Sequence, residues 1–418
     1  MPSLGCIADD FTGGTDLSSN LVKGGFRTLQ TLGVPSEGVE LSDVDAIVVA
    51  LKSRTVPVGE AKALPLEALR WLQTIGCCRF YFKYCSTFDS TPAGNIGPVI
   101  DALLEELGEP LTVVCPAFPD NGRTVYRGHL FVHDQLLSES GMQNHPLTPM
   151  TDANIIRVLS AQTQSRVDLI RYDTIIQGFE AIRQRIAKLR DLGVRMVVTD
   201  TISNRDLLTL GESISDLKLV TGGSGLALGL HPDSVNTPST LEFSIPAGKR
   251  AILAGSCSKA TLAQIEHAKR EYPSFLLRPF DLHYDFAGAL NHALSWAREH
   301  LNQSKTVLIY SSGNPVEVSL AQTQLGLQHA SELVEQALSE LASYLAEEGV
   351  RQFIVAGGET SGAVVNALKI RALRIGKEIA PGIPWTLGLG GPHPVALALK
   401  SGNFGATNFL TDAWNSLS

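Results

Sequence analysis

Short apolar runs alternate with longer amphipathic stretches along the chain, and this alternation predicts the elements of the fold. Nine runs of four to six residues, rich in Val and Ile, are predicted to be β-strands. These runs are Leu4–Ala8, Ala46–Leu51, Arg79–Lys83, Leu111–Cys115, Met196–Thr199, Leu217–Thr221, Arg250–Ala254, Thr306–Tyr310 and Gln352–Ala356. Near-continuous hydrophobicity over so few residues is typical of strands that are buried on both faces of a parallel sheet.

The stretches between these runs carry apolar residues at helical spacing. Over Ala330–Glu348, Leu, Val and Ala recur every three or four residues with Glu between them. Helices are also predicted over Gly178–Leu192 and from Thr360 or Ser361 through Leu368. Strands that alternate with helices in this way indicate an α/β fold with largely parallel sheets.

The length of the chain predicts two domains. A chain of 418 residues is long for one hydrophobic core. The segment Gly229–Pro246 has three prolines, polar fillers and no helical period, and it separates the first six predicted strands from the last three. We therefore expect domains of residues 1–235 and 246–418.

Composition and charge narrow the function classes. Hydrophobic residues make up 44% of the chain and charged residues 18%, which excludes a disordered or fibrous protein. The net charge is -8, so neither a nucleic acid nor an anionic membrane is expected as the main partner. No stretch reaches the roughly 18 apolar residues of a membrane helix, and the N-terminus lacks the basic region of a signal peptide. Six cysteines without a CxxC pair predict free thiols in a cytoplasmic protein, and no zinc site.

Two polar loops in the first half follow predicted strands, where an α/β fold presents its ligands. Asp9 and Asp10 follow the first strand and precede Gly13 and Gly14. Paired carboxylates orient a polyol, accept a proton or bind a hard cation. The alternative is that one Asp merely caps the helix that starts near Thr12.

The second loop follows Arg79–Lys83 and suits a small hydroxylated anion. Lys83 supplies a positive charge, and Ser86, Thr87 and Asp89 supply hydrogen bonds to hydroxyls. The alternative is a turn stabilised by its own Asp and Ser or Thr side chains.

A third loop, Pro116–Thr124, follows the strand Leu111–Cys115. Its Asp-Asn-Gly sequence is typical of a tight turn. Asp120 and Arg123 are nevertheless candidates for lining a pocket.

Glycine-rich loops mark the second half. Gly255–Lys259 is a candidate phosphate cradle between a strand and a helix. Ala356–Ala363 joins a strand to a helix N-terminus, where backbone N–H groups and the helix dipole favour an anion. Thr360 and Ser361 offer hydroxyls to phosphate or Mg2+, and the alternative is a capped helix with packing glycines. Gly402–Gly405 is a further candidate ligand turn.

Two nucleotide-binding fingerprints are absent from the sequence. It has no GxxxxGK[ST] and no GxGxxG after a strand. Neither a standard P-loop enzyme nor a dinucleotide-dependent dehydrogenase is therefore supported.

Taken in order, the polar and glycine-rich loops resemble those of the four-carbon acid sugar kinase family. The resemblance runs from about residue 5 to about residue 410 and is nearest to the 3-oxo-tetronate 4-kinases of that family. It rests on the segments LGCIADDFTGGTDL, FKYCSTFDSTPAGNIG, PAFPDNGRTVYRGHLFV, TGGSGLALGL, GSCSKAT, VAGGETSGAVVNAL and SGNFG.

The resemblance implies two α/β domains with a cleft between them, an N-terminal one for the acid sugar and a C-terminal one for ATP. It implies phosphorylation of the terminal hydroxyl of 3-oxo-tetronate by ATP with Mg2+, whose protein ligands it does not identify. The implied nucleotide-binding residues are Ser258, Thr360, Ser361, Gly362, Ala363 and Asn403.

Roles for the remaining candidates follow from this expectation. Asp9 or Asp10 orients or deprotonates the attacking hydroxyl, and Lys83, with Arg123, holds the substrate carboxylate. Ser86, Thr87 and Asp89 fix the other substrate oxygens, and Asp120 lines the pocket. Phosphates lie against the loop that includes Gly357 and Gly358, and Lys259 offsets developing charge.

Two alternatives remain open. One is a kinase of the same family that acts on D-threonate or D-erythronate. The other is a non-catalytic, two-lobed acid-sugar-binding protein. A homodimer is also allowed.

Overall fold

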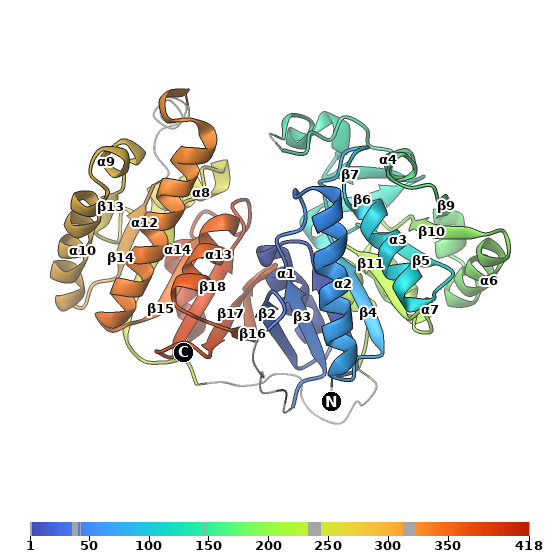
Figure 1. The fold of residues 1–418 in the computed structure, drawn as a ribbon, viewed down its shortest axis with the longest axis horizontal. Coiled ribbons are helices and arrows are strands. Elements are labelled where there is room, and N and C mark those ends of the chain that lie inside the picture. The colour runs from blue at the N-terminus through green and yellow to red at the C-terminus, as the bar shows by residue number, and fades with distance from the viewer. Residues whose placement is uncertain are drawn as a thin grey trace. The chain divides into compact units, whose positions relative to one another are not determined.

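The computed structural model describes residues 2–35, 41, 43–145, 147–232, 244–311 and 323–417. The chain forms two compact units, Met1–Thr240 and Leu241–Ser418, each of which contains parallel strands covered by helices (Figure 1). Residues 233–243 of the predicted boundary segment lie outside the described residues.

The described part of the N-terminal unit contains a sheet of eight parallel strands in the order β2-β3-β1-β4-β11-β5-β10-β9. Its strands are β1 (Leu4–Ala8), β2 (Thr28–Leu32), β3 (Ala46–Ala50), β4 (Arg79–Lys83), β5 (Thr112–Cys115), β9 (Arg166–Ile170), β10 (Val194–Thr199) and β11 (Leu219–Gly222). The strands β2 and β3 lie on one side of β1, and β4 and the later strands lie on the other side. The carboxyl edge of the sheet between β1 and β4 is therefore a topological switch point. Ligands bind at such points in open α/β sheets.

Helices cover both faces of this sheet. One face carries α2 (Val58–Thr74), α3 (Ile96–Leu107) and α4 (Ile155–Gln162), which pack in sequence against each other (Figure 1). The other face carries α1 (Phe11–Lys23), α6 (Phe179–Asp191) and α7 (Asn204–Ser213), with the short α5 (Tyr172–Ile175) beside α6. After β5, the strands β6 (Arg123–Tyr126), β7 (His129–Val132) and β8 (Gln135–Leu136) form a small antiparallel sheet.

The C-terminal unit has a mixed sheet in the order β13-β14-β12-β15-β18-β17-β16. Its strands are β12 (Lys249–Ala254), β13 (Ser274–Leu276), β14 (Val307–Tyr310), β15 (Val350–Ala356), β16 (Ala372–Ala380), β17 (Ile383–Leu389) and β18 (Val395–Lys400). The first five strands in this order are parallel, whereas β17 and β16 are antiparallel additions. The carboxyl ends of β12, β15 and β18 therefore lie together at one edge.

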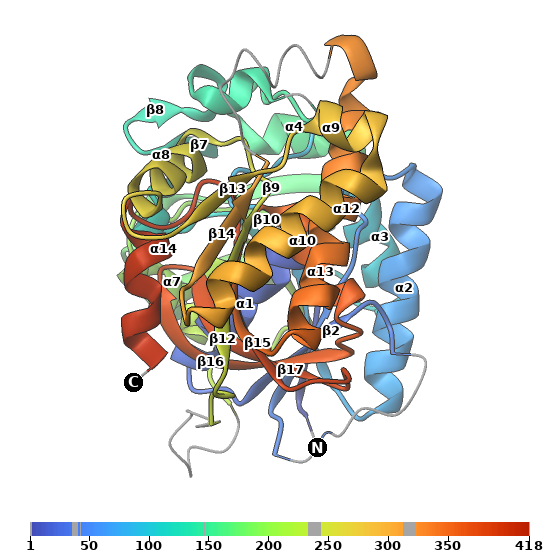
Figure 2. The ribbon, with the colours of Figure 1, turned by 90° about the vertical axis from the view of Figure 1, so that its left-hand side faces the viewer.

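Helices also sandwich this second sheet (Figure 2). On one face lie α9 (Pro279–Tyr284), α10 (Phe286–Asn302), α12 (Leu327–Glu347) and α13 (Gly358–Ala367). On the other face, α8 (Lys259–Ala268) and α14 (Phe409–Asp412) enclose an apolar core that includes Ile265, Trp385 and Trp414. Burial of such aromatic and aliphatic side chains is the main force that holds these layers together.

The α/β class with largely parallel sheets is confirmed. All nine predicted strands are present, with ends within two residues of the prediction. The helix predicted to start at Thr360 or Ser361 begins at Gly358 instead, because Gly357 takes a φ of 131° and turns the chain into the helix at that point.

Candidate functional site

Arg54 is the centre of an acidic cluster at the carboxyl edge of the N-terminal sheet. Its Nε and Nη2 donate to the two carboxylate oxygens of Asp9 at 2.9 and 2.8 Å. Nη2 also donates to Asp10 Oδ1 at 2.7 Å, and Nη1 lies 3.4 Å from Asp89 Oδ2. These side chains follow β1, β3 and β4, which are neighbours in the sheet.

Two cations face three carboxylates in this cluster. The Lys83 ammonium is buried, and its one charged partner among the described residues is Asp10 Oδ1, at 4.0 Å. Burial raises the pKa of Asp9 above its ordinary value, although Arg54 opposes the shift. Burial acts on Asp10 as well, but Arg54 and Lys83 outweigh it and lower the pKa of Asp10. Asp10 is also the more accessible of the two acids, with 30% of its side chain exposed against 6% for Asp9.

Neighbouring residues fix the position of Arg54. Asn95, just before α3, donates through its amide to the carbonyls of Ser53, Arg54 and Val56 at 3.3, 3.0 and 2.9 Å. The amide of Ser53 in turn donates to the carbonyl of Asp9 at 3.0 Å. The loop after β3 is therefore held against both β1 and α3.

Gly13 leaves room for the cluster. A Cβ at this position would lie 2.1 Å from Asp10 Oδ1 and 2.4 Å from Lys83 Nζ. Asp10 occupies the position before α1, but its carboxylate accepts from Arg54 and from Thr12 Oγ1, at 3.1 Å, rather than capping the helix. The capping alternative therefore does not explain the pair of acids.

The loop after β4 carries two consecutive residues in a backbone conformation that side chains rarely adopt. Phe88 has a φ of 65° and Asp89 a φ of 41°. Phe88 is buried and packs edge-on against Tyr84, while Thr87 Oγ1 donates to Asp89 Oδ1 at 2.6 Å. Strain of this kind persists where the surroundings hold it, and it is frequent at binding sites. Ser86 is half-buried in the same loop.

Asp120 and Arg123 make their contacts elsewhere. Asp120 accepts a hydrogen bond from Asn204 Nδ2 at 2.8 Å, and Arg123 donates to the carbonyl of Asn121. Both follow β5, which is three strands away from β1, a lateral distance of roughly 14 Å at about 4.8 Å per strand. Their role in substrate binding stays a prediction.

Arg54 was not among the residues predicted from the sequence. The signal was present, because Lys52-Ser53-Arg54 follows a predicted strand just as Asp9 follows the first one.

In the C-terminal unit, three loops interlock at the ends of β12, β15 and β18. The amides of Gly255 and Ser256 donate to the carbonyl of Ala356 at 3.0 and 3.2 Å, and the amide of Gly357 donates to that of Lys400 at 2.9 Å. A Cβ on Gly255 would lie 2.3 Å from Thr360 Oγ1. Glycine at this position therefore allows the loop after β12 to approach the start of α13.

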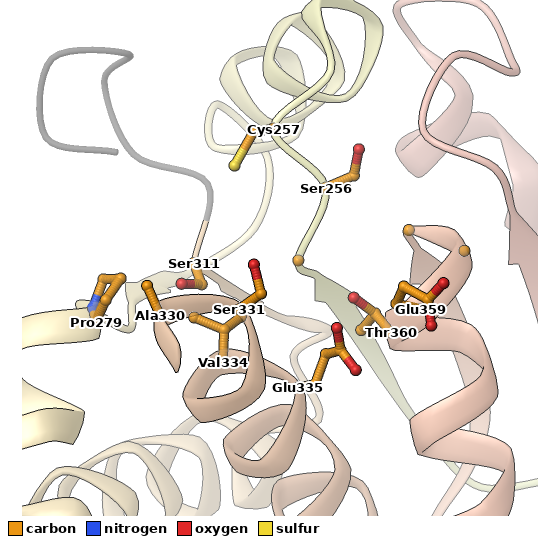
Figure 3. Close-up of a pocket in the computed structure, with 13 residues that line it drawn as sticks. Ser256, Cys257, Pro279, Ser311, Ala330, Ser331, Val334, Glu335, Glu359 and Thr360 are labelled. Carbon is orange, nitrogen blue, oxygen red and sulfur yellow. The ribbon is translucent and has the colours of Figure 1, made fainter. Parts of the chain in front are cut away.

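A cavity of about 330 Å³ opens beside these loops, within the size range of small-molecule sites. Figure 3 shows that three segments contribute most of its wall: the loop after β12, α12 and the start of α13. Its lining residues are Gly255, Ser256, Cys257, Pro279, Ser311, Ala330, Ser331, Val334, Glu335, Gly357, Gly358, Glu359 and Thr360.

The remaining predicted nucleotide residues lie next to this cavity. Ser258 caps α8 and donates through Oγ to the carbonyl of Gly402 at 2.5 Å, so the turn that carries Asn403 lies beside the start of α8. Asn403 and Lys259 are exposed, whereas Ser361 and Gly362 are buried in the first turns of α13, with Ala363 half-buried. The Ser361 hydroxyl is buried without a hydrogen-bond partner among the described residues.

Other features bear on the class of protein. In the described part of the chain, no group of three or more His, Cys, Asp or Glu side chains is placed to bind a metal ion. The described helices include none that is long and apolar enough to cross a membrane. All six cysteines are free.

Comparison with known proteins connects both sites to one family. A model of a sugar-binding N-terminal domain matches residues 4–230, and a model of a nucleotide-binding C-terminal domain matches residues 251–410. A 3-oxo-tetronate kinase of Pseudomonas fluorescens is 55% identical, over 100% of this chain and 97% of its own length. Kinases of the same name from Burkholderia multivorans and Pectobacterium atrosepticum are 54% and 47% identical, over 100% and 99% of this chain and 97% and 99% of their own lengths.

Solved structures agree with this assignment. A protein of Haemophilus influenzae is 43% identical and superposes with a TM-score of 0.81, over 99% of this chain and 100% of its own. A protein of Salmonella typhimurium LT2, provisionally described as a tRNA synthase, is 42% identical with a TM-score of 0.90, over 99% of each chain. The sequence over its full length and the fold therefore lead to one conclusion: the chain belongs to the four-carbon acid sugar kinase family.

Proposed function

We propose that the protein is an ATP-dependent kinase that converts 3-oxo-tetronate to 3-oxo-tetronate 4-phosphate, a phosphotransferase with an alcohol group as acceptor. The observation that carries this proposal is the identity of 47–55% to three relatives named 3-oxo-tetronate kinase, over 99–100% of this chain. The matched length includes the segments that carry the acidic cluster and the glycine-rich loops. The comparisons do not favour the D-threonate and D-erythronate kinases or a non-catalytic binding protein.

The cluster around Arg54 is the proposed acid-sugar site. Lys83 has an ammonium with no hydrogen bond to any described residue, which suits the carboxylate of the substrate. The Ser86 hydroxyl can donate to the substrate's keto oxygen, and Thr87 and Asp89 can accept from its hydroxyl groups. The site lies at the switch point of the sheet, where ligands of this fold class bind.

Asp10 is the proposed acceptor of the hydroxyl proton. Both oxygens of Asp9 are bound by Arg54, whereas Asp10 is more exposed and has a lowered pKa, so it is ionised at neutral pH. Asp9 and Arg54 then act by orienting Asp10. In the reaction, the terminal oxygen attacks the γ-phosphorus, the bond to the bridging β,γ-oxygen breaks, ADP leaves, and the proton passes to Asp10.

The loops of the C-terminal unit form the proposed ATP site. The apolar wall of the cavity, made by Pro279, Ala330 and Val334, suits the adenine ring. The phosphates suit the N-terminus of α13 and the hydroxyls of Thr360 and Ser361, because N–H groups and the helix dipole favour an anion there. The unpartnered Ser361 hydroxyl fits this assignment.

The donor set beside these loops also fits Mg2+. Glu335 on α12 and Glu359 on α13 line the cavity (Figure 3). Mg2+ is usually bound by one or two carboxylates together with phosphate oxygens and water. When bound, the ion would neutralise charge on the transferred phosphate. Glu335 and Glu359 are the residues proposed to hold it.

A kinase of this kind needs a steady supply of ATP, which together with the six free cysteines supports a cytoplasmic location. The homodimer that the sequence allows remains a proposal, tested by sedimentation of the purified protein.

A coupled ADP-release assay tests the proposed function. Mg-ATP is combined in turn with 3-oxo-tetronate, D- and L-threonate, D- and L-erythronate, and no acid. We expect turnover on 3-oxo-tetronate and little release of ADP without an acid. Turnover on D-threonate or D-erythronate alone would replace the substrate, and no turnover on any acid would refute the kinase.

A further inference from the structure

Lys400 is the last residue of β18 and is completely buried, an unusual place for a lysine. Its ammonium donates hydrogen bonds to Thr261 Oγ1 and to the carbonyl of Gly402, both at 3.1 Å. The same carbonyl accepts from Ser258 Oγ at 2.5 Å and from Thr261 Oγ1 at 2.8 Å. Lys400 therefore ties the turn that carries Asn403 to the beginning of α8.

No carboxylate among the described residues forms an ion pair with Lys400. The other buried lysine at a strand end, Lys83, differs in this respect because it faces Asp10. Burial alone lowers the pKa of Lys400 to about 7. The described residues therefore do not balance the charge that this lysine carries when it is protonated.

The elements around Lys400 do carry other titratable groups. On β12, β15, α8, α13 and their connections these are Lys249, Arg250, Cys257, Lys259, Glu266, His267, Arg351 and Glu359. None of them contributes to the shift of the Lys400 pKa, which has burial as its one cause. A counter-charge for Lys400 therefore has to come from outside the described residues.

Lys400 lies between the two loops to which the proposed function assigns the phosphates. Its carbonyl accepts from the amide of Gly357, directly before α13, and its ammonium shares the Gly402 carbonyl with Ser258, the cap of α8. The buried hydroxyl of Ser361 is a second group in this region without a partner in the described part of the chain. A polyanion bound at these loops would bring negative charge to the end of β18, where the Lys400 ammonium is buried.

We propose that nucleotide binding draws a proton onto Lys400, so that this lysine is a positioning residue whose charge stabilises the bound phosphates and holds the Gly402 turn in place. The inference rests on the proposed function, because it takes the phosphates of ATP as the anion. The sign follows from linkage: an anion nearby favours the charged amine, so the complex holds more protons than the free protein.

The size of the effect follows from the same relation. At pH 7 the free amine is about half protonated, and a rise of one unit in its pKa on binding takes up about 0.4 proton per nucleotide. The contribution of Lys400 to affinity is complete below about pH 7 and is lost as the pH rises through the pKa of the complex. In total, the affinity for nucleotide falls about ten-fold for each unit by which nucleotide binding raises the pKa of Lys400.

Isothermal titration calorimetry measures this uptake. The Mg2+ complex of β,γ-imido-ATP, which is not hydrolysed, is titrated into the full chain at pH 7 in PIPES and in Tris, whose ionisation enthalpies differ. Wild type is compared with Lys400→Met, which removes the amine, and with Lys305→Met, an exposed lysine at the opposite edge of the sheet. Using the difference between variants cancels protons that the nucleotide itself exchanges.

We expect wild type and Lys305→Met to take up about 0.4 proton more per nucleotide than Lys400→Met. Because Lys400 loses its proton as the pH rises, wild type and Lys305→Met should also lose more nucleotide affinity between pH 7 and pH 9 than Lys400→Met does. Equal uptake in all three, with nucleotide bound, would overturn the inference and leave the proposed function standing. Absence of nucleotide binding by wild type would overturn both. If Lys400→Met does not fold, Lys400→Arg replaces it: its permanent charge predicts the same loss of uptake.

Discussion

Arg54 organises the acidic cluster because one guanidinium contacts three carboxylates. Asp9 is buried and has both oxygens on Arg54, so it is oriented without being available to substrate. Asp10 shares the same guanidinium, but 30% of its side chain is exposed. We therefore propose different chemical roles for these two adjacent residues, with Asp9 orienting Asp10 and Asp10 accepting the proton.

Asp10→Asn is expected to lower kcat by about 10²–10⁴-fold with little change in ATP affinity, because it removes the proton acceptor and leaves the nucleotide loops intact. The measurement is steady-state kinetics with ATP binding by calorimetry. Asp45→Asn is the matched control, since Asp45 also pairs with an arginine, Arg27, at 2.8 Å, but lies at the opposite end of β3. Unchanged turnover in Asp10→Asn would remove Asp10 from the mechanism.

The burial of Lys400 leads to a second prediction, which concerns the pH dependence of the free energy of unfolding. Its pKa of about 7 in the fold lies below the value of about 10.4 in an unfolded chain, so the unfolded state binds more protons between these values. The free energy of unfolding of wild type therefore rises with pH over this range. The stability advantage of Lys400→Met over wild type should shrink by roughly 3 kcal/mol between pH 7 and pH 9.5.

Urea unfolding followed by tryptophan fluorescence checks this, since Trp296, Trp385 and Trp414 all lie in the C-terminal unit. Hydrogen bonds lost by the variant add an offset that does not depend on pH. A difference that stays constant from pH 7 to pH 9.5 would show that Lys400 is charged throughout.

At the scale of elements, the first turn of α1 has a glycine where the Asp10 and Lys83 side chains leave no room for a Cβ. Gly13→Ala places a methyl group on Asp10 Oδ1 and Lys83 Nζ, the ends of two side chains rather than backbone. We therefore expect kcat/KM to fall by about 10–100-fold, while thermal stability changes little because alanine favours the helix by roughly 0.5–1 kcal/mol.

Gly59→Ala in α2 is the matched substitution, since a Cβ there meets nothing within 4 Å. It should leave activity unchanged and raise stability slightly. Full activity in Gly13→Ala would mean that the cluster rearranges freely.

The strands that carry the sites could be predicted from sequence because they are short apolar runs with polar residues at their ends. The strand β2 could not be predicted in this way, because three of its five residues are polar although they are buried: Thr28, Gln30 and Thr31. Their side chains donate to the carbonyls of Phe26, Phe11 and Gly33, at 3.2, 3.2 and 2.9 Å, and such partners are invisible in a hydrophobic pattern. The strand β17 is obscured in the same way, by Pro384 and Gly388 within it.

The sites were predicted in part for a related reason. Residues within one loop, such as Lys83, Thr87 and Asp89, are near each other in sequence and were recognised together. Arg54 belongs to the same cluster only because β3 pairs with β1, a fact of strand order. Lys400 was not predicted as a site residue because a lysine is expected at the surface, and only the packing of the fold shows that this one is buried.

At the scale of the whole molecule, the two units present different chemistry at the carboxyl edges of their sheets. The N-terminal unit has an acidic cluster with a buried ammonium that makes no hydrogen bond to a described residue, an arrangement suited to a hydroxylated anion. The C-terminal unit has helix N-termini, a cavity and a buried lysine, suited to a polyphosphate. We therefore propose that the phosphate acceptor and the phosphate donor bind to separate units of the chain.

The central claim is that the γ-phosphate passes from ATP to the terminal hydroxyl of the acid sugar. Phosphorus NMR of the products of Mg-ATP and 3-oxo-tetronate tests it most directly. We expect ADP and, in equal amount, a phosphate ester whose phosphorus couples to the two protons of the terminal carbon. Inorganic phosphate alone, or an acyl phosphate on the carboxylate, would contradict it.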